Sequence, residues 1–416
     1  MNDNQEFHVG RNTGRPVPAP LSVLAASILA VALPAPSLAD WSLAPLVRVG
    51  WENDDNPRLT ARTDEEVDLR GYLGELTLGL GYAAERTEFS FRPRLLVRDY
   101  PDETDFESND VFLASTFDHR MRSSSIGFRI NYDEQQVRNA ERTDVDLDSE
   151  DPDDVEGIGT GEVALSGDRS KLRFVPRWTY DFSNTSSIDV RLNYYDVSYD
   201  NVFADLLTDY TDARLGLTYR RAMTNRTSFL AMASGRHYEA DDPDIENVDG
   251  LSGQVGIERA MSETTRLRAM VGVENTEQTV GQKDPEMIGE LTLMRSLETI
   301  SMYAQYRRSV NASGAGQVSV RDQVNVNFNR RLNEKITTGL GVRAYKTASL
   351  GDRVSVLDDR EYVQLRAQFI WHMTRAFAFE TSYQYTVIDR GPSLDGKANS
   401  NRINLWFTWE PTPLGR

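Results

Sequence analysis

From residue 40 onward, apolar and polar residues alternate with a period of two in one segment after another. Within residues 317–328, for example, Val318, Val320 and Val324 alternate with polar neighbours. A period of two gives an extended strand one apolar and one polar face, whereas an amphipathic helix has a period of about 3.6. No comparably long segment shows the helical period, so the sequence predicts an all-β protein.

The alternation predicts eighteen strands, each long enough to cross a bilayer when tilted. Pro93 and Pro176 fall inside two of them and remove a ladder donor, so we expect a bulge at each. The expected strands are 41–52, 70–83, 87–100, 109–120, 125–137, 170–182, 187–200, 209–222, 227–239, 250–261, 265–276, 286–296, 299–309, 317–330, 335–347, 360–372, 376–387 and 399–410.

The connections between these strands alternate in length. Tight polar turns such as 84–86 and 297–298 follow the even strands, while longer acidic or glycine-containing loops such as 53–66 and 240–249 follow the odd strands. A soluble propeller also repeats at about 40 residues, but each of its blades holds four short strands. Alternation in both face and loop length is typical of a transmembrane antiparallel up-and-down β-barrel, with short periplasmic turns and long acidic extracellular loops.

We therefore expect residues 40–416 to form one outer-membrane β-barrel of about 18 strands. Lipid cannot satisfy an unpaired backbone amide, so the first and last strands must pair and close the wall. Residues 1–39 are predicted to be a signal peptide, because the apolar run 21–33 is too short to span a bilayer and Ser37 and Ala39 suit a signal peptidase. A short membrane anchor is the alternative for this segment. The expected location is the cell outer membrane.

Composition narrows the function. The formal net charge is −18, which disfavours nucleic acid as a partner. The absence of cysteine excludes thiol catalysis, disulfides and zinc–thiolate sites. The four histidines are scattered along the chain, so we expect no metal site, no cofactor and no catalytic group.

The more apolar face of the strands is expected to contact lipid, and the opposite face to line the lumen. The apolar face includes Leu95, Ile126, Leu215, Val271 and Phe369. The polar face is rich in arginine, the side chain that forms bidentate contacts with carboxylate and phosphate. The candidate lumen residues are Arg92, Arg94, Arg129, Arg173, Arg177, Arg191, Arg214, Arg236, Arg266, Arg268, Arg307, Arg321, Arg343, Arg366 and Arg402.

Two interpretations of these arginines remain open. A pore lined by guanidinium groups would attract anionic solutes such as a uronate-bearing polysaccharide. The arginines could equally pair with inward carboxylates, among them Glu75, Asp189, Glu258, Glu274 and Glu380, and brace the wall.

The connection at 141–156 holds nine acidic residues and one arginine. Asp144, Asp146 and Asp148 have the spacing of the start of an EF-hand loop. However, Ser149 replaces the turn glycine, and Val155 occupies the position of the bidentate glutamate. We expect a solvated loop near lipopolysaccharide that binds divalent cations at most loosely.

The segment Trp51-Glu52-Asn53-Asp54-Asp55-Asn56-Pro57-Arg58-Leu59 carries a resemblance to a known family, together with two further stretches. These are 94–100 ahead of Asn109-Asp110, and 176–180 followed by 194–199. They resemble the outer-membrane β-barrel family found with exopolysaccharide and PEP-CTERM/exosortase gene sets, a putative β-barrel porin. The resemblance covers mainly the first half of the barrel and implies a protein linked to surface polysaccharide.

The leading functional hypothesis is an outer-membrane channel for export of an anionic exopolysaccharide through the arginine-lined lumen. A general diffusion porin or a structural barrel is the alternative, and an outer-membrane enzyme is a weaker one. Expected partners are outer-membrane lipid and lipopolysaccharide, the outer-membrane assembly machinery, and periplasmic export components with their anionic polysaccharide. The sequence does not reveal the transported substrate, the oligomeric state or whether a loop plugs the pore.

Overall fold

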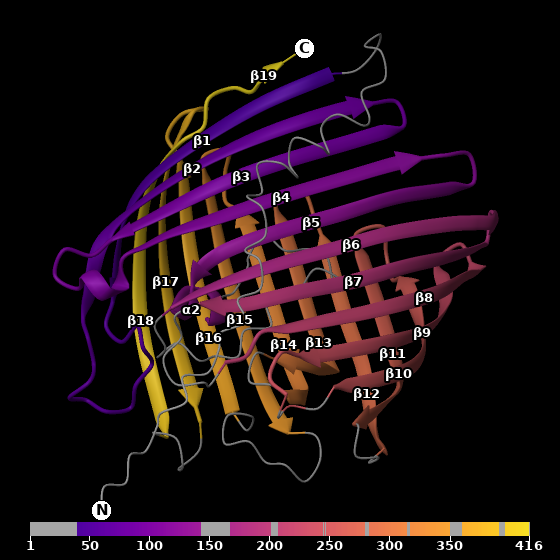
Figure 1. The fold of residues 1–416 in the computed structure, drawn as a ribbon. Helices are drawn as coiled ribbons and strands as arrows, with labels where there is room; N and C mark the ends of the chain where they lie inside the picture. Colours follow the sequence, from indigo (N-terminus) through magenta and orange to yellow (C-terminus); the bar gives the residue numbers. More distant parts are fainter. Residues whose placement is uncertain are drawn as a thin grey trace, which may run out of the picture. The chain divides into compact units, whose positions relative to one another are not determined.

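The computed structural model describes residues 40–142, 167–200, 207–243, 245, 247–278, 283–313, 317–349, 360–390 and 396–415. Eighteen long antiparallel strands in this part of the chain pair in sequence order and form one closed sheet (Figure 1). The strands are β1 Asp40–Asp54, β2 Leu69–Ala84, β3 Thr87–Asp99, β4 Ser108–Arg120, β5 Ser124–Gln136, β6 Asp168–Ser183, β7 Ser186–Asp200, β8 Tyr210–Thr224, β9 Thr227–Ala240, β10 Val248–Ala260, β11 Thr265–Gln278, β12 Lys283–Ser296, β13 Ile300–Ser313, β14 Gln317–Arg331, β15 Ile336–Ser349, β16 Arg360–His372, β17 Phe377–Asp389 and β18 Lys397–Trp409.

The sheet closes because β1 pairs with β2 along one edge and with β18 along the other. In the closing ladder Trp51 lies opposite Leu405, and Val47 lies opposite Trp409. A two-residue strand, β19 (Leu414–Gly415), continues the pairing along the first residues of β1. The predicted closed barrel of eighteen strands is confirmed, and each strand lies within a few residues of its predicted bounds. The signal-peptide prediction concerns residues outside the described ranges.

Pro93 and Pro176 produce gaps in the ladder and not the bulges that the sequence suggested. The β2–β3 ladder is interrupted opposite Pro93, and the β6–β7 ladder opposite Pro176, but the register is the same on both sides of each gap. On their other sides both prolines stay paired, with Leu113 and Phe128. A missing N–H therefore removes local hydrogen bonding without inserting a residue. The register shifts that do occur lie beside two of the short turns.

Short turns join the strands at one end of the barrel, and most connections at the other end are longer, as predicted. We call these the turn end and the loop end. The exceptions at the loop end are the short connections between β11 and β12 and between β13 and β14. Two short helical segments lie in the loop-end connections, the 3₁₀ turn η1 (Thr104–Phe106) and the helix α2 (Val137–Glu141). No helix in the described ranges is long and apolar enough to cross a membrane.

Within the described ranges, buried apolar residues form four small clusters and not one core. One cluster joins Leu59, from the β1–β2 connection, to Tyr345, Tyr362 and Ile388 on the inner face of the wall. Another joins Tyr238 of β9 to Val310 of β13, which lies several strands away. Loop-end segments therefore pack inside the barrel.

Candidate functional site: an arginine-lined lumen

The outer surface of the barrel exposes large apolar side chains. Eleven residues predicted to face lipid belong to this exposed set, which fits a wall surrounded by acyl chains better than a shared dry interior. They are Leu95, Val97, Ile126, Leu215, Leu217, Val271, Val273, Leu365, Phe369, Trp371 and Phe377.

The predicted arginines lie on the opposite face of their strands. On β8, for example, Arg214 alternates with the exposed Leu215 and Leu217 and reaches side chains of other strands inside the barrel. The predicted set lies on twelve strands: Arg92 and Arg94 on β3, Arg129 on β5, Arg173 and Arg177 on β6, Arg191 on β7, Arg214 on β8, Arg236 on β9, Arg266 and Arg268 on β11, Arg307 on β13, Arg321 on β14, Arg343 on β15, Arg366 on β16 and Arg402 on β18.

Many of these arginines are paired with inward carboxylates. Arg236 contacts Asp212 at 2.7 Å, and Glu290 contacts both Arg307 at 2.9 Å and Arg268 at 3.7 Å. The arginines therefore brace the wall, as the second interpretation of the sequence held. They also surround open space, so bracing does not exclude contact with a solute.

The prediction missed further arginines of the lumen. Arg48 on β1 bonds Glu380 at 2.6 Å and lies over the Trp406 ring, 4.4 Å from its centroid. Arg220 on β8 forms a bidentate contact with Glu258, in which each terminal nitrogen lies 3.0 Å from a carboxylate oxygen. Strand parity could have identified both, because each alternates with residues of the outer face.

The segment containing α2 folds into the barrel and crosses toward β1 and β18. Arg142 donates to Asp54 at 2.7 Å and to Ser400 at 3.2 Å, and its side chain is only 3% exposed. Glu141 accepts from Arg169 of β6 at 3.1 Å and from the Tyr199 hydroxyl of β7 at 3.0 Å. Buried ionic contacts thus hold this segment at both of its sides.

The motif that carried the family resemblance builds the inward packing at the loop end. Asn56 donates to the carbonyls of Thr60 and Asn399 and accepts from the Thr60 amide, which folds the β1–β2 connection inward. Leu59 is fully buried there, in a left-handed conformation (φ 49°), and its carbonyl accepts from Arg390. Asp54, in the same motif, accepts the hydrogen bond from Arg142.

Buried polar contacts continue into the next connection. The Tyr100 hydroxyl donates to Glu52 at 2.7 Å, and Arg138 donates to the Phe106 carbonyl at 3.2 Å while lying over the Phe106 ring. Burial, reinforced by the charge of Glu52, raises the pKa of the Tyr100 hydroxyl. Burial also lowers the pKa of the Arg138 guanidinium, although Tyr100 and Glu52 oppose this shift.

The tip of the β13–β14 hairpin is a second inward segment. Its Val310 carbonyl accepts from Arg236 of β9 at 3.1 Å and from Arg214 of β8 at 3.3 Å. Neighbouring strands lie about 4.8 Å apart, so the five intervals from β8 to β13 correspond to about 24 Å of wall. An arginine cannot bridge that distance along the wall, so this tip lies across the lumen. We call residues 309–313 and 317–320 the strap.

Below the strap lies a cavity of about 260 Å³, which we call the lumen cavity. It has a cationic side and an apolar side. The cationic side includes Arg177, Arg191, Arg214, Arg268 and Arg307, together with the carboxylates Asp189, Glu274 and Glu290 that pair with several of them. The apolar side includes Leu230, Met232, Met270 and Ile288. Arg177 lies directly opposite Arg191 in the β6–β7 ladder, and Asp189, which also lines the cavity, contacts Arg177 at 2.6 Å.

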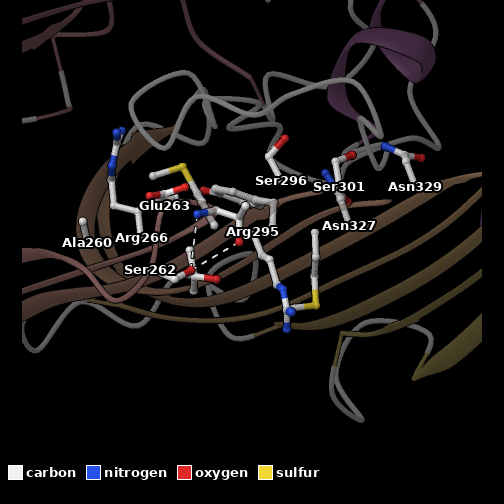
Figure 2. A pocket seen from close by; sticks show the side chains of 14 residues that line it. Ala260, Ser262, Glu263, Arg266, Arg295, Ser296, Ser301, Asn327 and Asn329 are labelled. Carbon is white, nitrogen blue, oxygen red and sulfur yellow. Dashed lines mark hydrogen bonds between the residues drawn. The ribbon is translucent and has the colours of Figure 1, made fainter. Parts of the chain in front are cut away.

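A second cavity, of about 280 Å³, lies at the turn end between the β10–β11 turn and strands β12 to β14 (Figure 2). Ser262 accepts from the Thr264 amide within the turn, while Arg266, Asn327 and Asn329 supply polar groups. Its lining contains serine and glutamate but no histidine. This lining can donate hydrogen bonds to a solute.

The histidines in the described ranges are not brought together. His119 lies near the turn end, where its ring contacts the Thr87 hydroxyl, and His237 contacts Asp249 near the loop end. Within these ranges no group of three or more histidine, aspartate or glutamate residues is arranged to hold a metal ion. The predicted loose cation site falls largely in 143–156, outside the described ranges.

Comparison with known proteins gives likenesses of architecture at very low sequence identity. The chain is similar to a BenF-like porin from Pseudomonas fluorescens Pf-5, with 9% identity, a TM-score of 0.47, and coverage of 89% of this chain and 99% of that one. It is also similar to Pseudomonas aeruginosa OpdQ, with 7% identity, a TM-score of 0.46, and coverage of 90% and 98%. The outer membrane protein opdK of the same species gives 9% identity, a TM-score of 0.44, and coverage of 91% and 99%.

No family model matches the chain. No curated protein matches it either. The barrel fold therefore rests on the strand pairing of this chain itself.

Proposed function

We propose that this protein is an outer-membrane channel that admits anionic solutes through its arginine-lined lumen. The observation that carries the proposal is the separation of the two faces, with large apolar side chains outside and arginine-rich polar side chains inside. A closed sheet with an apolar outer surface satisfies its backbone inside a bilayer and leaves a polar interior. On this proposal the turn end faces the periplasm and the loop end faces outward.

Export of an anionic exopolysaccharide is the use we favour. A uronate chain presents repeated carboxylates, and arginines at many heights in the wall can receive them in succession. Support for this use comes from the lumen arginines and from the family resemblance of residues 51–59. Periplasmic export components would dock at the turn end, while lipopolysaccharide and the assembly machinery would contact the wall.

A general porin for small anions is the second candidate, and the inward segments favour it. The α2 segment and the strap both occupy the loop end, where a polymer must leave the lumen. A small solute passes such a constriction more easily than a polymer does. Polysaccharide export therefore requires at least one of these segments to move aside.

Conductance tests the channel itself. The purified protein in a planar bilayer should conduct with preference for chloride over potassium. Replacing Arg129, Arg191 and Arg366 by serine should bring the permeability ratio close to one, whereas Arg226→Ser, in an exposed turn, should leave it unchanged. A sealed barrel, or one that prefers cations, would contradict the proposal.

Polysaccharide export is tested separately in the producing cell. Deleting the gene should reduce exported polysaccharide and raise the amount retained in the periplasm. Unchanged export, together with normal anion conductance of the purified protein, would reject the exopolysaccharide role and favour the general porin.

A further inference from the structure

The wall of the barrel is parted at the loop end between β12 and β13. Within the described parts of both strands, their ladder ends at Gly289 opposite Arg308. Beyond this point β12 continues to Lys283 while paired with β11, and β13 continues to Ser313 while paired with β14. The strap has therefore turned inward and left the β12–β13 seam open above Gly289.

Two residues at the seam are compatible with the absence of backbone pairing there. Pro285 of β12 lacks an N–H, and prolines in sheets occur mainly on edges. Arg308 takes over part of the missing ladder, because its Nε donates to the Met287 carbonyl at 3.1 Å. The same guanidinium contacts Glu286 at 3.4 Å and Asp322 at 2.6 Å. A charged side chain thus occupies the seam in place of backbone hydrogen bonds.

The seam adjoins the lumen cavity. Ile288, Gly289, Arg308 and Ser309 line this cavity together with the lumen arginines. Arg308 belongs to the outer face, because it alternates on β13 with the inward Arg307 and shares a face with the exposed Tyr306. The lining of one cavity therefore runs from inside the barrel to a residue of its outer face.

The chemistry of the lumen cavity matches an amphiphile. Its cationic side would bind a phosphate, and the apolar side, next to the seam, would bind the first methylenes of an acyl chain. Seven arginines but only three carboxylates, Asp189, Glu274 and Glu290, line the cavity, so its lining keeps a net positive charge. A cavity of about 260 Å³ holds a headgroup but not two acyl chains, which would have to remain in the bilayer.

We propose that the β12–β13 seam is a lateral portal through which the phosphate headgroup of an anionic membrane lipid enters the lumen cavity. The headgroup lies among Arg191, Arg268 and Arg307, and its chains pass between Met287 and the strap into the membrane. This inference requires membrane insertion but no conduction, so it can fail or hold independently of the channel.

Disulfide trapping tests the open seam, and the absence of native cysteine makes the experiment clean. If the ladder continued past Gly289, Met287 would face Val310. The Met287→Cys/Val310→Cys variant should therefore cross-link poorly under mild oxidation. The control Leu291→Cys/Tyr306→Cys, a directly paired set in the intact ladder, should cross-link readily. Equal cross-linking of both pairs in folded protein would overturn the portal.

Lipid retention tests the ligand. After extraction from vesicles of mixed phosphatidylglycerol and phosphatidylcholine with identical chains, native mass spectrometry should show retained phosphatidylglycerol. Arg191→Gln/Arg307→Gln should reduce this retention at least fivefold, whereas Arg226→Gln should not change it. Heat-modified migration on gels confirms that each variant is folded.

Two results would reject the lipid. One is equal retention of both lipids, or retention that the double variant does not reduce. The other is displacement of phosphatidylglycerol by millimolar inorganic phosphate or glucuronate, which would identify a site for free anions only.

Discussion

Single residues decide how the inward segments are held. Asp54, Arg142 and Ser400 form a closed triad, since Ser400 donates to Asp54 at 2.6 Å while Arg142 contacts both. Two opposite charges buried this deeply stabilise the fold only while both are present, because either one alone would be left uncompensated. The exposed pair of Lys346 and Glu361 has the same chemistry without the burial.

We expect Asp54→Asn to lower the free energy of unfolding by about 3 kcal/mol or more, because Arg142 would keep a buried charge without its counter-ion. The same change should increase conductance, since α2 would lose its anchor on β1. Urea titration followed by heat-modified migration measures the first effect. The control Glu361→Gln should cost less than about 1 kcal/mol, as exposed ion pairs do, and a similar cost for both variants would contradict the role of burial.

The stability of the barrel should depend on pH through Asp209, which precedes β8 at the loop end. Partial burial and the nearby Asp241, Asp200 and Asp196 raise its pKa, although the Tyr199 amide opposes the shift. An acid whose pKa is raised in the folded state binds protons more readily there, so its charge destabilises the barrel above that pKa and this penalty disappears as pH falls through it.

Asp209→Asn should therefore be more stable than the parent protein at pH 7, and the difference should shrink as the pH approaches 4. Asparagine can still accept from the Tyr199 amide, so the hydrogen bond is retained. Urea midpoints of both proteins across this pH range measure the difference. A constant difference would show that the charge of Asp209 is not its source.

Among the secondary-structure elements, the close approach of β10 and β11 depends on glycine. A Cβ on Gly272 would lie 2.0 Å from the carbonyl oxygen of Gly253, whereas a Cβ on Gly253 would meet nothing within 4 Å. Backbone atoms of a paired strand cannot move aside as a flexible side chain can. The two positions therefore form a matched pair on adjacent strands.

We expect Gly272→Ala to destabilise the barrel by about 1–3 kcal/mol, the usual cost of overpacking. Gly253→Ala should be neutral or slightly stabilising, because alanine restricts the unfolded chain more than glycine does. Thermal unfolding of the two variants side by side measures the contrast. Equal stability of the two variants would contradict the close approach.

The strands could be predicted from the sequence, but the inward segments could not. Alternation is a local property, so it located the eighteen long strands and the inward face of each predicted arginine. Val310, Val318 and Val320 also alternate regularly, yet they are buried inside the strap because β13 leaves β12. Nothing in the local pattern distinguishes them from residues facing lipid.

The carboxylate partners of the lumen arginines could not be predicted from the sequence either. They depend on register and on contacts across the lumen, such as that of Arg214 with Glu274. Residues 51–59 take part in the inward packing through Glu52, Asp54, Asn56 and Leu59. Their role as a folding element was visible only in the structure.

At the scale of the whole molecule, the strap lies across the lumen at the loop end. Arg214 and Arg236 hold it through the Val310 carbonyl, so Arg214→Gln/Arg236→Gln should raise single-channel conductance at least twofold and make it fluctuate. Single-channel recording measures the change, with Arg226→Gln as the control. Unaltered conductance would show that the strap does not limit ion flow.

Ring closure has a consequence for how the barrel is made. Its last ladder joins β1 to β18, from opposite ends of the chain, and Leu414 then extends the contact to Leu43 of β1. Such distant pairing forms slowly, and until it forms both terminal strands expose unpaired edges that can aggregate. Until the C-terminal residues have joined β1, these two edges are therefore the places where aggregation of the barrel would begin.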